Sequence, residues 1–181
     1  VLLVPLLVGL AACASLRSDV AWESAHGRDH PLAGWVWDVA ARRFLDAETL
    51  VARLTSDRFI LLGEKHDNPD HHRLQTWVLD RLIAAGRRPA VGFEMFTVDD
   101  TPRIARYLAP GQRSAAGLGD AVDWSRSGWP AWALYKPIAD RALAARLPIV
   151  APNLGPTATR TVARQGLRAL DPSLVARLGL G

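Results

Sequence analysis

The segment Phe59–Pro69 reads Phe-Ile-Leu-Leu-Gly-Glu-Lys-His-Asp-Asn-Pro. Its first four residues are all apolar and are followed by Gly63, a pattern typical of a short strand that is buried on both faces. Asn68 and Pro69 predict the start of a helix, because Asn is a favoured N-cap and Pro is favoured at the first helical position. A strand followed at once by a helix indicates an α/β protein.

The rest of the chain continues this alternation. Apolar residues at helical spacing follow Pro69 as far as Gly86, and short apolar runs at 90–93 and 149–151 predict two further strands. Helices are expected at 46–54, 102–108, 131–147, 157–166 and 171–178. The order strand, helix, strand predicts a parallel sheet with right-handed crossovers. The expected fold class is therefore α/β: a Rossmann-like parallel sheet flanked by helices, with a helical Trp- and Gly-rich insertion in which the stretch 110–130 is rich in loops.

The first twelve residues carry no charge and end at Cys13. The stretch is too short to cross a bilayer as a helix and has the size of the apolar core of a secretory signal. The residues Leu10-Ala11-Ala12-Cys13 resemble a bacterial lipobox, in which the cysteine is lipidated. The alternative is an ordinary signal peptide with a chance cysteine.

Three segments are expected on this basis. Residues 1–12 form a lipoprotein signal peptide, residues 13–34 a lipidated cysteine and tether, and residues 35–181 one α/β domain. Because three strands are few for such a sheet, part of the domain is expected to be missing at the C-terminus. Ala14 follows the cysteine, as in lipoproteins of the outer membrane, so the expected location is the outer membrane of a bacterial cell envelope.

Composition excludes several classes of protein. The chain has 181 residues, of which 49% are hydrophobic, so it is too apolar to be disordered. The 22 Lys and Arg exceed the 18 Asp and Glu without forming a basic run, which argues against a nucleic-acid partner. The single cysteine excludes an internal disulfide framework and a cysteine-based zinc site.

Polar side chains follow each predicted strand. Glu64 and His66 come after the first strand, Glu94 after the second and Asn153 after the third. Ligands of such sheets bind outside the carboxyl ends of the strands, so these side chains are expected at a shared edge. A histidine with two carboxylates suits a divalent metal or general acid–base chemistry. The alternative is that Glu64 pairs with a neighbouring cation.

The two histidines of the next helix are less specific. His71 and His72 fall in the first turn, where His71 can face the same edge or the solvent. The Gly-x-x-His pattern of Gly63–His66 is also weak, because Gly27–His30 matches it too.

Aromatic residues gather after the glycine-rich stretch. Trp124, Trp129, Trp132 and Tyr135 lie within twelve residues, in a chain with seven tryptophans. Such a density can line a slot for a flat apolar ligand. The alternative is that Trp132 and Tyr135 fill the core, since Tyr135 shares a helical face with Ile138.

Five stretches of the chain resemble the ChaN-like lipoproteins of the haem-binding uptake and Tiki superfamily. They are residues 62–72 (Leu-Gly-Glu-Lys-His-Asp-Asn-Pro-Asp-His-His), 92–96 (Gly-Phe-Glu-Met-Phe), 123–124, 128–130 and 132–135. The resemblance covers about residues 35–165. It implies a surface-tethered protein facing the periplasm that binds haem for iron acquisition, through a tyrosine, in a dimer that stacks two haems.

The resemblance also implies site residues and partners. Tyr135 is preferred to Tyr107 as the iron ligand because it lies in a matching stretch, and Trp129, Trp132 and His71 are the other candidate haem-binding residues. The candidate cations for the haem propionates are Lys65, Arg73 and Lys136. The implied partners are haem, the membrane through the lipid anchor, a second copy of the chain and an outer-membrane haem receptor.

The superfamily also contains metal-dependent proteases, which have two Gly-x-x-His motifs and a glutamate. Gly63–His66 matches the first motif and Glu94 the glutamate, but no second motif follows Glu94. The alternative function is therefore a metal-dependent hydrolase with His66 as a metal ligand and Glu64 or Glu94 as a second ligand or general base. A third hypothesis is a structural lipoprotein that binds neither haem nor metal.

Overall fold

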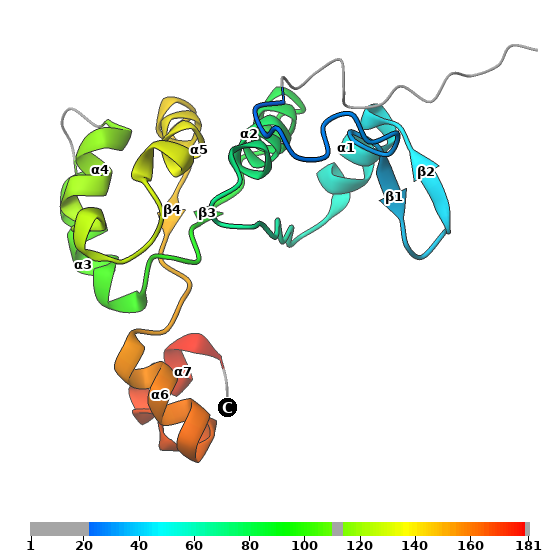
Figure 1. The fold of residues 1–181 in the computed structure, drawn as a ribbon. Helices are drawn as coiled ribbons and strands as arrows, with labels where there is room; N and C mark the ends of the chain where they lie inside the picture. The colour runs from blue at the N-terminus through cyan, green and yellow to red at the C-terminus, as the bar shows by residue number, and fades with distance from the viewer. Residues whose placement is uncertain (1–21, 110–113, 180–181) are drawn as a thin grey trace, which may run out of the picture. The chain divides into compact units, whose positions relative to one another are not determined.

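The computed structural model describes residues 22–109 and 114–179 (Figure 1). The chain divides into two compact units, residues 1–87 and 88–181. The predicted signal peptide (1–12), Cys13 and the first part of the tether lie outside the described residues. Within the described ranges, no helix has both the length and the apolar character needed to cross a bilayer.

The first unit contains a hairpin and two helices, in the order β1 (Val36–Asp38), β2 (Arg43–Leu45), α1 (Ala47–Ser56) and α2 (Pro69–Ala84). The second unit follows with β3 (Val91–Gly92), α3 (Thr101–Leu108), α4 (Ala115–Ala121), α5 (Trp132–Ala144), β4 (Ile149–Val150), α6 (Pro156–Gln165) and α7 (Pro172–Leu178). Short 3₁₀ helices at Val98–Asp100, Trp124–Arg126 and Leu167–Ala169 connect these elements.

The helix starts of the first unit lie where the sequence predicts them. The side chain of Asn68 accepts a hydrogen bond of 2.9 Å from the backbone N–H of Asp70, and Pro69 opens α2. Asp46 caps α1 in the same way, accepting from the N–H of Thr49 at 2.7 Å. Each cap satisfies an N–H group that the first helical turn leaves unpaired, which explains why these starts can be read from local sequence.

The core of the first unit lies between its two helices. Trp77, Val78 and Leu82 of α2 are buried, and Leu50 and Leu54 of α1 pack against them. The middle of the predicted tether is held to the same helix. The backbone N–H groups of residues 23 and 24 donate to the buried carboxylate of residue 70 at 2.7 and 2.8 Å.

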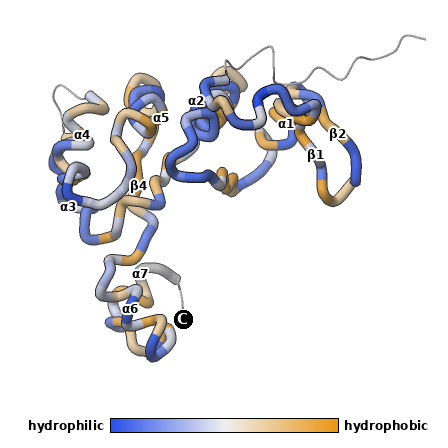
Figure 2. Tube along the Cα trace, viewed as in Figure 1, coloured by the Kyte–Doolittle hydropathy of each residue, from blue (hydrophilic) through white to orange (hydrophobic). Residues whose placement is uncertain are grey.

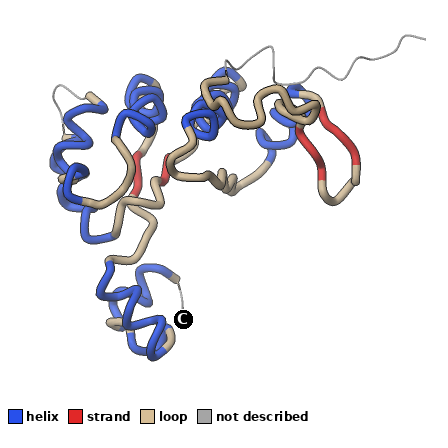
Figure 3. The backbone as a smooth tube through the Cα atoms, viewed as in Figure 1, coloured by secondary structure: helices blue, strands red, loops and turns tan. Residues whose placement is uncertain are grey.

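The parallel sheet is smaller than the sequence predicts. β3 and β4 pair in parallel, with Val91 opposite Ile149, so the second and third predicted strands do lie side by side. The predicted strand at 59–62 is instead a loop between α1 and α2, with Phe59 77% and Leu61 95% exposed (Figure 3). Figure 2 shows hydrophobic residues in this loop.

The absence of this strand has a physical reason. A strand needs a neighbour for its backbone groups, and within the described part of the first unit β1 and β2 pair only with each other. The general α/β class is therefore found, whereas the strands within residues 22–109 and 114–179 form two two-stranded sheets, so the Rossmann-like arrangement is not confirmed.

The core of the second unit is aromatic. Phe93, Phe96, Trp124 and Tyr135 are buried, with ring centroids of neighbouring members 4.9 to 6.1 Å apart. The stretch expected to be mostly loop contains α4, which packs on α5. The indole N–H of Trp132 on α5 donates to the carbonyl of Ala115 on α4 at 2.8 Å, which joins the two helices.

Candidate functional site

Glu64 lies at the centre of a small polar cluster in the first unit. Its side chain is 8% exposed, with Oε1 2.9 Å from Nδ1 of His66 and Oε2 3.1 Å from Nδ1 of His72. The predicted site residues Glu64 and His66 thus lie within hydrogen-bond distance of each other. Nε2 of His72 donates to the backbone carbonyl of His66 at 3.0 Å, because a carbonyl oxygen can only accept.

The start of α2 brings these groups together. The capped turn at Asn68 folds the first turn of α2 back over residues 64–66, so that His72 is buried and Nδ1 of His71 accepts from the N–H of Lys65 at 2.7 Å. Sequence reasoning missed the role of His72. The available signal was a carboxylate just before a helix whose first turn holds a histidine.

The predicted metal site is not supported. Glu94 is exposed at the end of β3 in the second unit, where its carbonyl accepts from Nδ2 of Asn153 at 2.9 Å. Glu64 and His66 belong to the first unit. Among the residues that the structure describes, no group of three or more His, Cys, Asp and Glu side chains could hold a metal ion.

Each cation predicted to bind a propionate lies close to a carboxylate. Nζ of Lys65 lies 3.5 Å from Asp67 and Nζ of Lys136 lies 2.7 Å from Asp140, while Arg73 donates to Glu23. None of these three cations lines either of the two pockets described below.

The aromatic candidates divide into core and pocket residues. Tyr135 is 1% exposed, and its ring centroid lies 4.9 Å from that of Trp124 and 6.4 Å from that of Trp132. Tyr135 and Trp132 thus take part in the core, as the alternative interpretation expected. The other tyrosine, Tyr107, donates to the carbonyl of Ser114 and accepts from its N–H, both at 2.9 Å.

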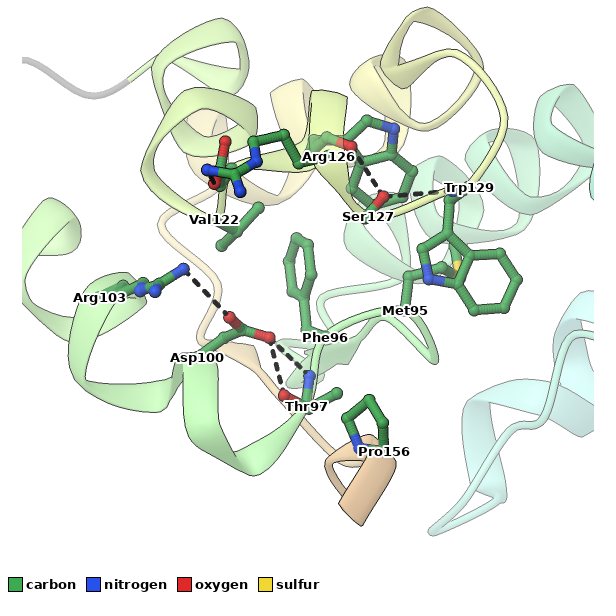
Figure 4. Close-up of a pocket in the computed structure, with 12 residues that line it drawn as sticks. Met95, Phe96, Thr97, Asp100, Arg103, Val122, Arg126, Ser127, Trp129 and Pro156 are labelled. Carbon is green, nitrogen blue, oxygen red and sulfur yellow. Dashed lines mark hydrogen bonds and ion pairs between the residues drawn. The ribbon is translucent and has the colours of Figure 1, made fainter. Parts of the chain in front are cut away.

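Trp129 lines a pocket of about 470 Å³ in the second unit, which we call the arginine pocket (Figure 4). This volume is in the range of small-molecule sites. The pocket is lined by Met95, Phe96, Thr97, Asp100, Arg103, Val122, Asp123, Trp124, Arg126, Ser127, Trp129 and Pro156.

The pocket has an apolar side and a side with two arginines, each paired with an aspartate that also lines the pocket. Figure 4 shows Met95 and Trp129 on one side of the Phe96 ring and the guanidinium groups of Arg103 and Arg126 on the other. A flat ring can lie against the first side while its acidic groups reach the second.

Both guanidinium groups are placed to bind an anion. Arg103 lies 3.9 Å from Asp100 and Arg126 lies 3.5 Å from Asp123, and both arginines are exposed. Ion pairs of this length at the surface are weak, so a carboxylate of a ligand can compete for the donors. Asp123 has a left-handed backbone with φ of 57°, a conformation that Asp tolerates better than most residues and that begins the 3₁₀ turn carrying Arg126.

Sequence reasoning missed both arginines. Arg126 lies between Trp124 and Trp129, so its place within the aromatic stretch was a usable signal. Arg103 comes from α3, and nothing in its local sequence links it to that stretch.

Comparison with known proteins agrees with this fold. Residues 50–180 match the family described as haem-binding uptake, Tiki superfamily, ChaN. The chain belongs to this family. It is also similar to the solved structure of ChaN of Campylobacter jejuni, which describes cofacial haem binding to that protein. The TM-score is 0.62 at 20% identity, over 72% of this chain and 52% of that one.

The similarity to the Campylobacter jejuni ChaN concerns the fold. This chain spans about half the length of that protein. No curated protein matches the chain. The membership of the ChaN-like family that residues 62–72 and 92–96 predict is thus confirmed.

Proposed function

We propose that this ChaN-family chain is a haem-binding lipoprotein, anchored to the outer membrane of a bacterium, that serves in iron and haem acquisition. The observation that carries the proposal is the arginine pocket, which sets an apolar aromatic wall beside two guanidinium groups. Haem can use both the aromatic wall and the guanidinium groups, because it has a flat apolar ring and two carboxylates at one edge.

The residues of the pocket fit this group. Met95, Phe96 and Trp129 would contact the ring, and Arg103 and Arg126 would hold the propionates. When bound, haem supplies the iron and an absorption band that reports on its surroundings. The excess of basic over acidic residues in 88–181 adds a general attraction for such an anion.

The remaining parts of the proposal concern anchoring and partners. Acylation of Cys13 would hold the protein at the membrane, since each buried CH₂ contributes about 0.8 kcal/mol and two or more chains give stable anchoring. A second copy of the chain and an outer-membrane haem receptor are the proposed protein partners. Both follow from the family resemblance, which implies a dimer that stacks two haems.

Titration of the purified protein with ferric haem tests the proposal. We expect a shifted Soret band that saturates, and a loss of affinity of about tenfold or more in the double variant Arg103→Gln/Arg126→Gln, because charge-assisted hydrogen bonds contribute about 1.5–3 kcal/mol each. Arg106→Gln is the matched control, since Arg106 is also exposed on α3 but does not line the pocket. Absence of a saturable Soret shift in the unmodified protein would overturn the proposal, and an equal loss in the control would remove the arginine pocket from it.

A further inference from the structure

The hairpin of β1 and β2 has an exposed aromatic face. Trp37 lies opposite Phe44 in the strand register, and their ring centroids are 4.9 Å apart in an edge-to-face arrangement. Trp37 is 49% exposed, Phe44 is 40% exposed, and Val39 in the turn is 79% exposed. Figure 1 shows this turn projecting beyond α1. The other face of the hairpin is covered, since Leu45 is buried and Val36 packs against the core of the first unit.

The aromatic surface extends from the hairpin into a second pocket, of about 370 Å³, because Trp35 and Trp37 line that pocket. Trp22 and Trp77 also line it, and no lining residue is charged. Exposed apolar surface of this kind is typical of a contact with another protein or with a membrane. Indole rings suit a membrane–water interface in particular, because they have an apolar body and a polar N–H.

The exposed charge of the hairpin is positive. Residues 39–45 include Arg42 and Arg43 and no acidic residue, and both arginines are exposed. The acid that ends β1, Asp38, has a side chain that is only 9% exposed and pairs with Arg53 of α1. Exposed rings next to arginines match a lipid surface, where apolar chains lie directly beneath negatively charged phosphates.

The tether keeps this surface close to the proposed anchor. Cys13, the proposed site of lipidation, precedes Trp22 by nine residues, so the chain can span at most about 30 Å between them. The N–H groups of Glu23 and Ser24 donate to the carboxylate of Asp70 on α2, which fixes the far end of this span to the first unit. An acylated Cys13 would therefore hold the first unit within reach of the bilayer.

We propose that Trp37, Val39, Arg42, Arg43 and Phe44, which we call the hairpin patch, rest on the surface of the anionic bilayer that holds the lipid anchor. The rings and Val39 enter the headgroup region, and the arginines meet the lipid phosphates. This inference rests on the proposed anchor and adds an orientation to it. The acyl chains retain the protein at the membrane, and the hairpin patch determines which side of the first unit faces the lipid.

The single cysteine allows the tether to be rebuilt in vitro. Residues 13–181 are the form expected after signal cleavage and contain every described residue. This form is coupled through Cys13 to a maleimide-bearing lipid in nanodiscs of equimolar phosphatidylethanolamine and phosphatidylglycerol. Hydroxyl-radical footprinting with mass spectrometry then gives an oxidation rate for each side chain. We expect the rates of Trp37 and Phe44 to fall severalfold on coupling, whereas that of Phe59, 77% exposed in a loop of the first unit, stays unchanged.

One pair of variants tests the role of charge. Arg42→Gln/Arg43→Gln removes two charges from the hairpin patch and is expected to abolish most of the protection of Trp37. The matched control is Arg160→Gln/Arg164→Gln, which removes two exposed charges from α6 and should leave the protection intact. Nanodiscs of phosphatidylcholine, which has no net charge, should protect the unmodified chain less than the anionic nanodiscs do.

A second pair locates the contact within the first unit. Val39→Asp places a carboxylate in the turn and should remove the protection of Trp37, and the exposure of Val39 means that the core is not disturbed. Leu61→Asp makes the same change of charge at a residue that is 95% exposed in the loop between α1 and α2, and it should keep the protection. The result on the unmodified chain decides the matter even where a variant fails to fold.

Three results separate the possible outcomes. Unchanged oxidation of Trp37 on coupling, or equal losses of protection in a hairpin variant and its control, would overturn the proposal. Protection of the uncoupled chain that grows with protein concentration would assign the hairpin patch to a second copy of the chain and overturn it as well. Palmitate labelling tests the natural anchor separately, because the maleimide bond supplies the tether here. A chain that takes up no palmitate yet protects Trp37 would disprove the anchor and not the contact.

Discussion

At the scale of single residues, burial separates the side chains that can meet a ligand from those that hold the fold. Tyr135 has the chemistry of an iron ligand, yet its phenol lies within the aromatic core. Arg103 and Arg126 have ordinary exposed positions, yet they line the arginine pocket. Residue type alone does not distinguish these situations.

Tyr135→Phe is the direct test of the tyrosine hypothesis. Because the ring packs against Trp124 and Trp132 and does not line the arginine pocket, we expect the Soret maximum of the haem-loaded protein to stay unchanged. The free energy of unfolding in urea should fall by about 1 kcal/mol, the usual cost of losing a buried hydroxyl's hydrogen bond. A clear change in the haem spectrum would instead support Tyr135 as the iron ligand.

Glu64→Ala should be costly for a different reason. The change removes the carboxylate that both buried His72 and partly buried His66 face. We therefore expect a loss of about 3 kcal/mol in the free energy of unfolding. Urea denaturation followed by circular dichroism measures it. The control is Asp67→Ala, which removes only an exposed pair with Lys65 and should change stability by less than about 0.5 kcal/mol. Equal effects in the two variants would contradict this interpretation of the cluster.

At the scale of elements, the junction between α4 and α5 depends on a residue without a side chain. A Cβ atom at Gly119 would lie 2.7 Å from Nε1 of Trp132, and that indole is fixed by its hydrogen bond to Ala115. Alanine normally stabilises a helix relative to glycine by about 1 kcal/mol. Here we expect Gly119→Ala to lower the free energy of unfolding by about 1–3 kcal/mol, through overpacking.

A double-mutant cycle checks the cause. In a Trp132→Ala background the indole, whose Nε1, Cδ1 and Cε2 would lie 2.7, 2.8 and 3.0 Å from the new Cβ, is absent, so Gly119→Ala should lose most of its cost. An unchanged cost in that background would show that the indole is not the obstacle.

The cap of α1 predicts a dependence on pH. The backbone N–H of Thr49, donating to Asp46, lowers the pKa of this carboxyl below its ordinary value of 3.8. A carboxyl with a lowered pKa stabilises the folded state above its ordinary pKa, and this contribution is lost as the pH falls through the folded-state value. Asp46→Ala should therefore lower the melting temperature by a few degrees at neutral pH, and the difference should fade as the pH falls below 3.8 and through the lowered pKa of the folded state.

Asp46→Asn separates the cap from the charge. Asparagine also accepts the hydrogen bond but does not titrate in this range, so its melting temperature should stay near that of the unmodified protein at neutral pH. A loss as large as that of Asp46→Ala would mean that charge, and not the cap hydrogen bond, stabilises this end of α1.

The sequence predicts the elements unequally well, because helices and strands depend on different ranges of interaction. Helix starts follow from adjacent residues, and Asp46, Asn68 and Pro69 all lie where local rules place them. The strand expected at 59–62 needed a distant partner that its own residues do not specify. The same distinction applies to the site. Trp129 could be predicted from the aromatic residues close to it in sequence, whereas Arg103 lines the pocket from another helix, α3.

At the scale of the whole molecule, the proposed lipid anchor depends on Cys13 and not on the folded units. Cys13 lies outside the described residues, and its lipidation stays a prediction from the lipobox. Expression in a Gram-negative bacterium with labelled palmitate is expected to label the protein and to place it in the outer-membrane fraction. Cys13→Ser should abolish the label and release the protein into the soluble periplasmic fraction. Retention in the membrane without the label would contradict the anchor.

The loop at 59–62 has a practical consequence for anyone who handles the protein. Phe59, Leu61 and Leu62 are exposed, while Ile60 packs against the core, and the run contains no charge or proline; such runs favour stacking between molecules. Concentrated stocks should therefore turn cloudy on storage while still folded, at a rate that rises steeply with concentration. Replacing the most exposed leucine with lysine should keep them clear.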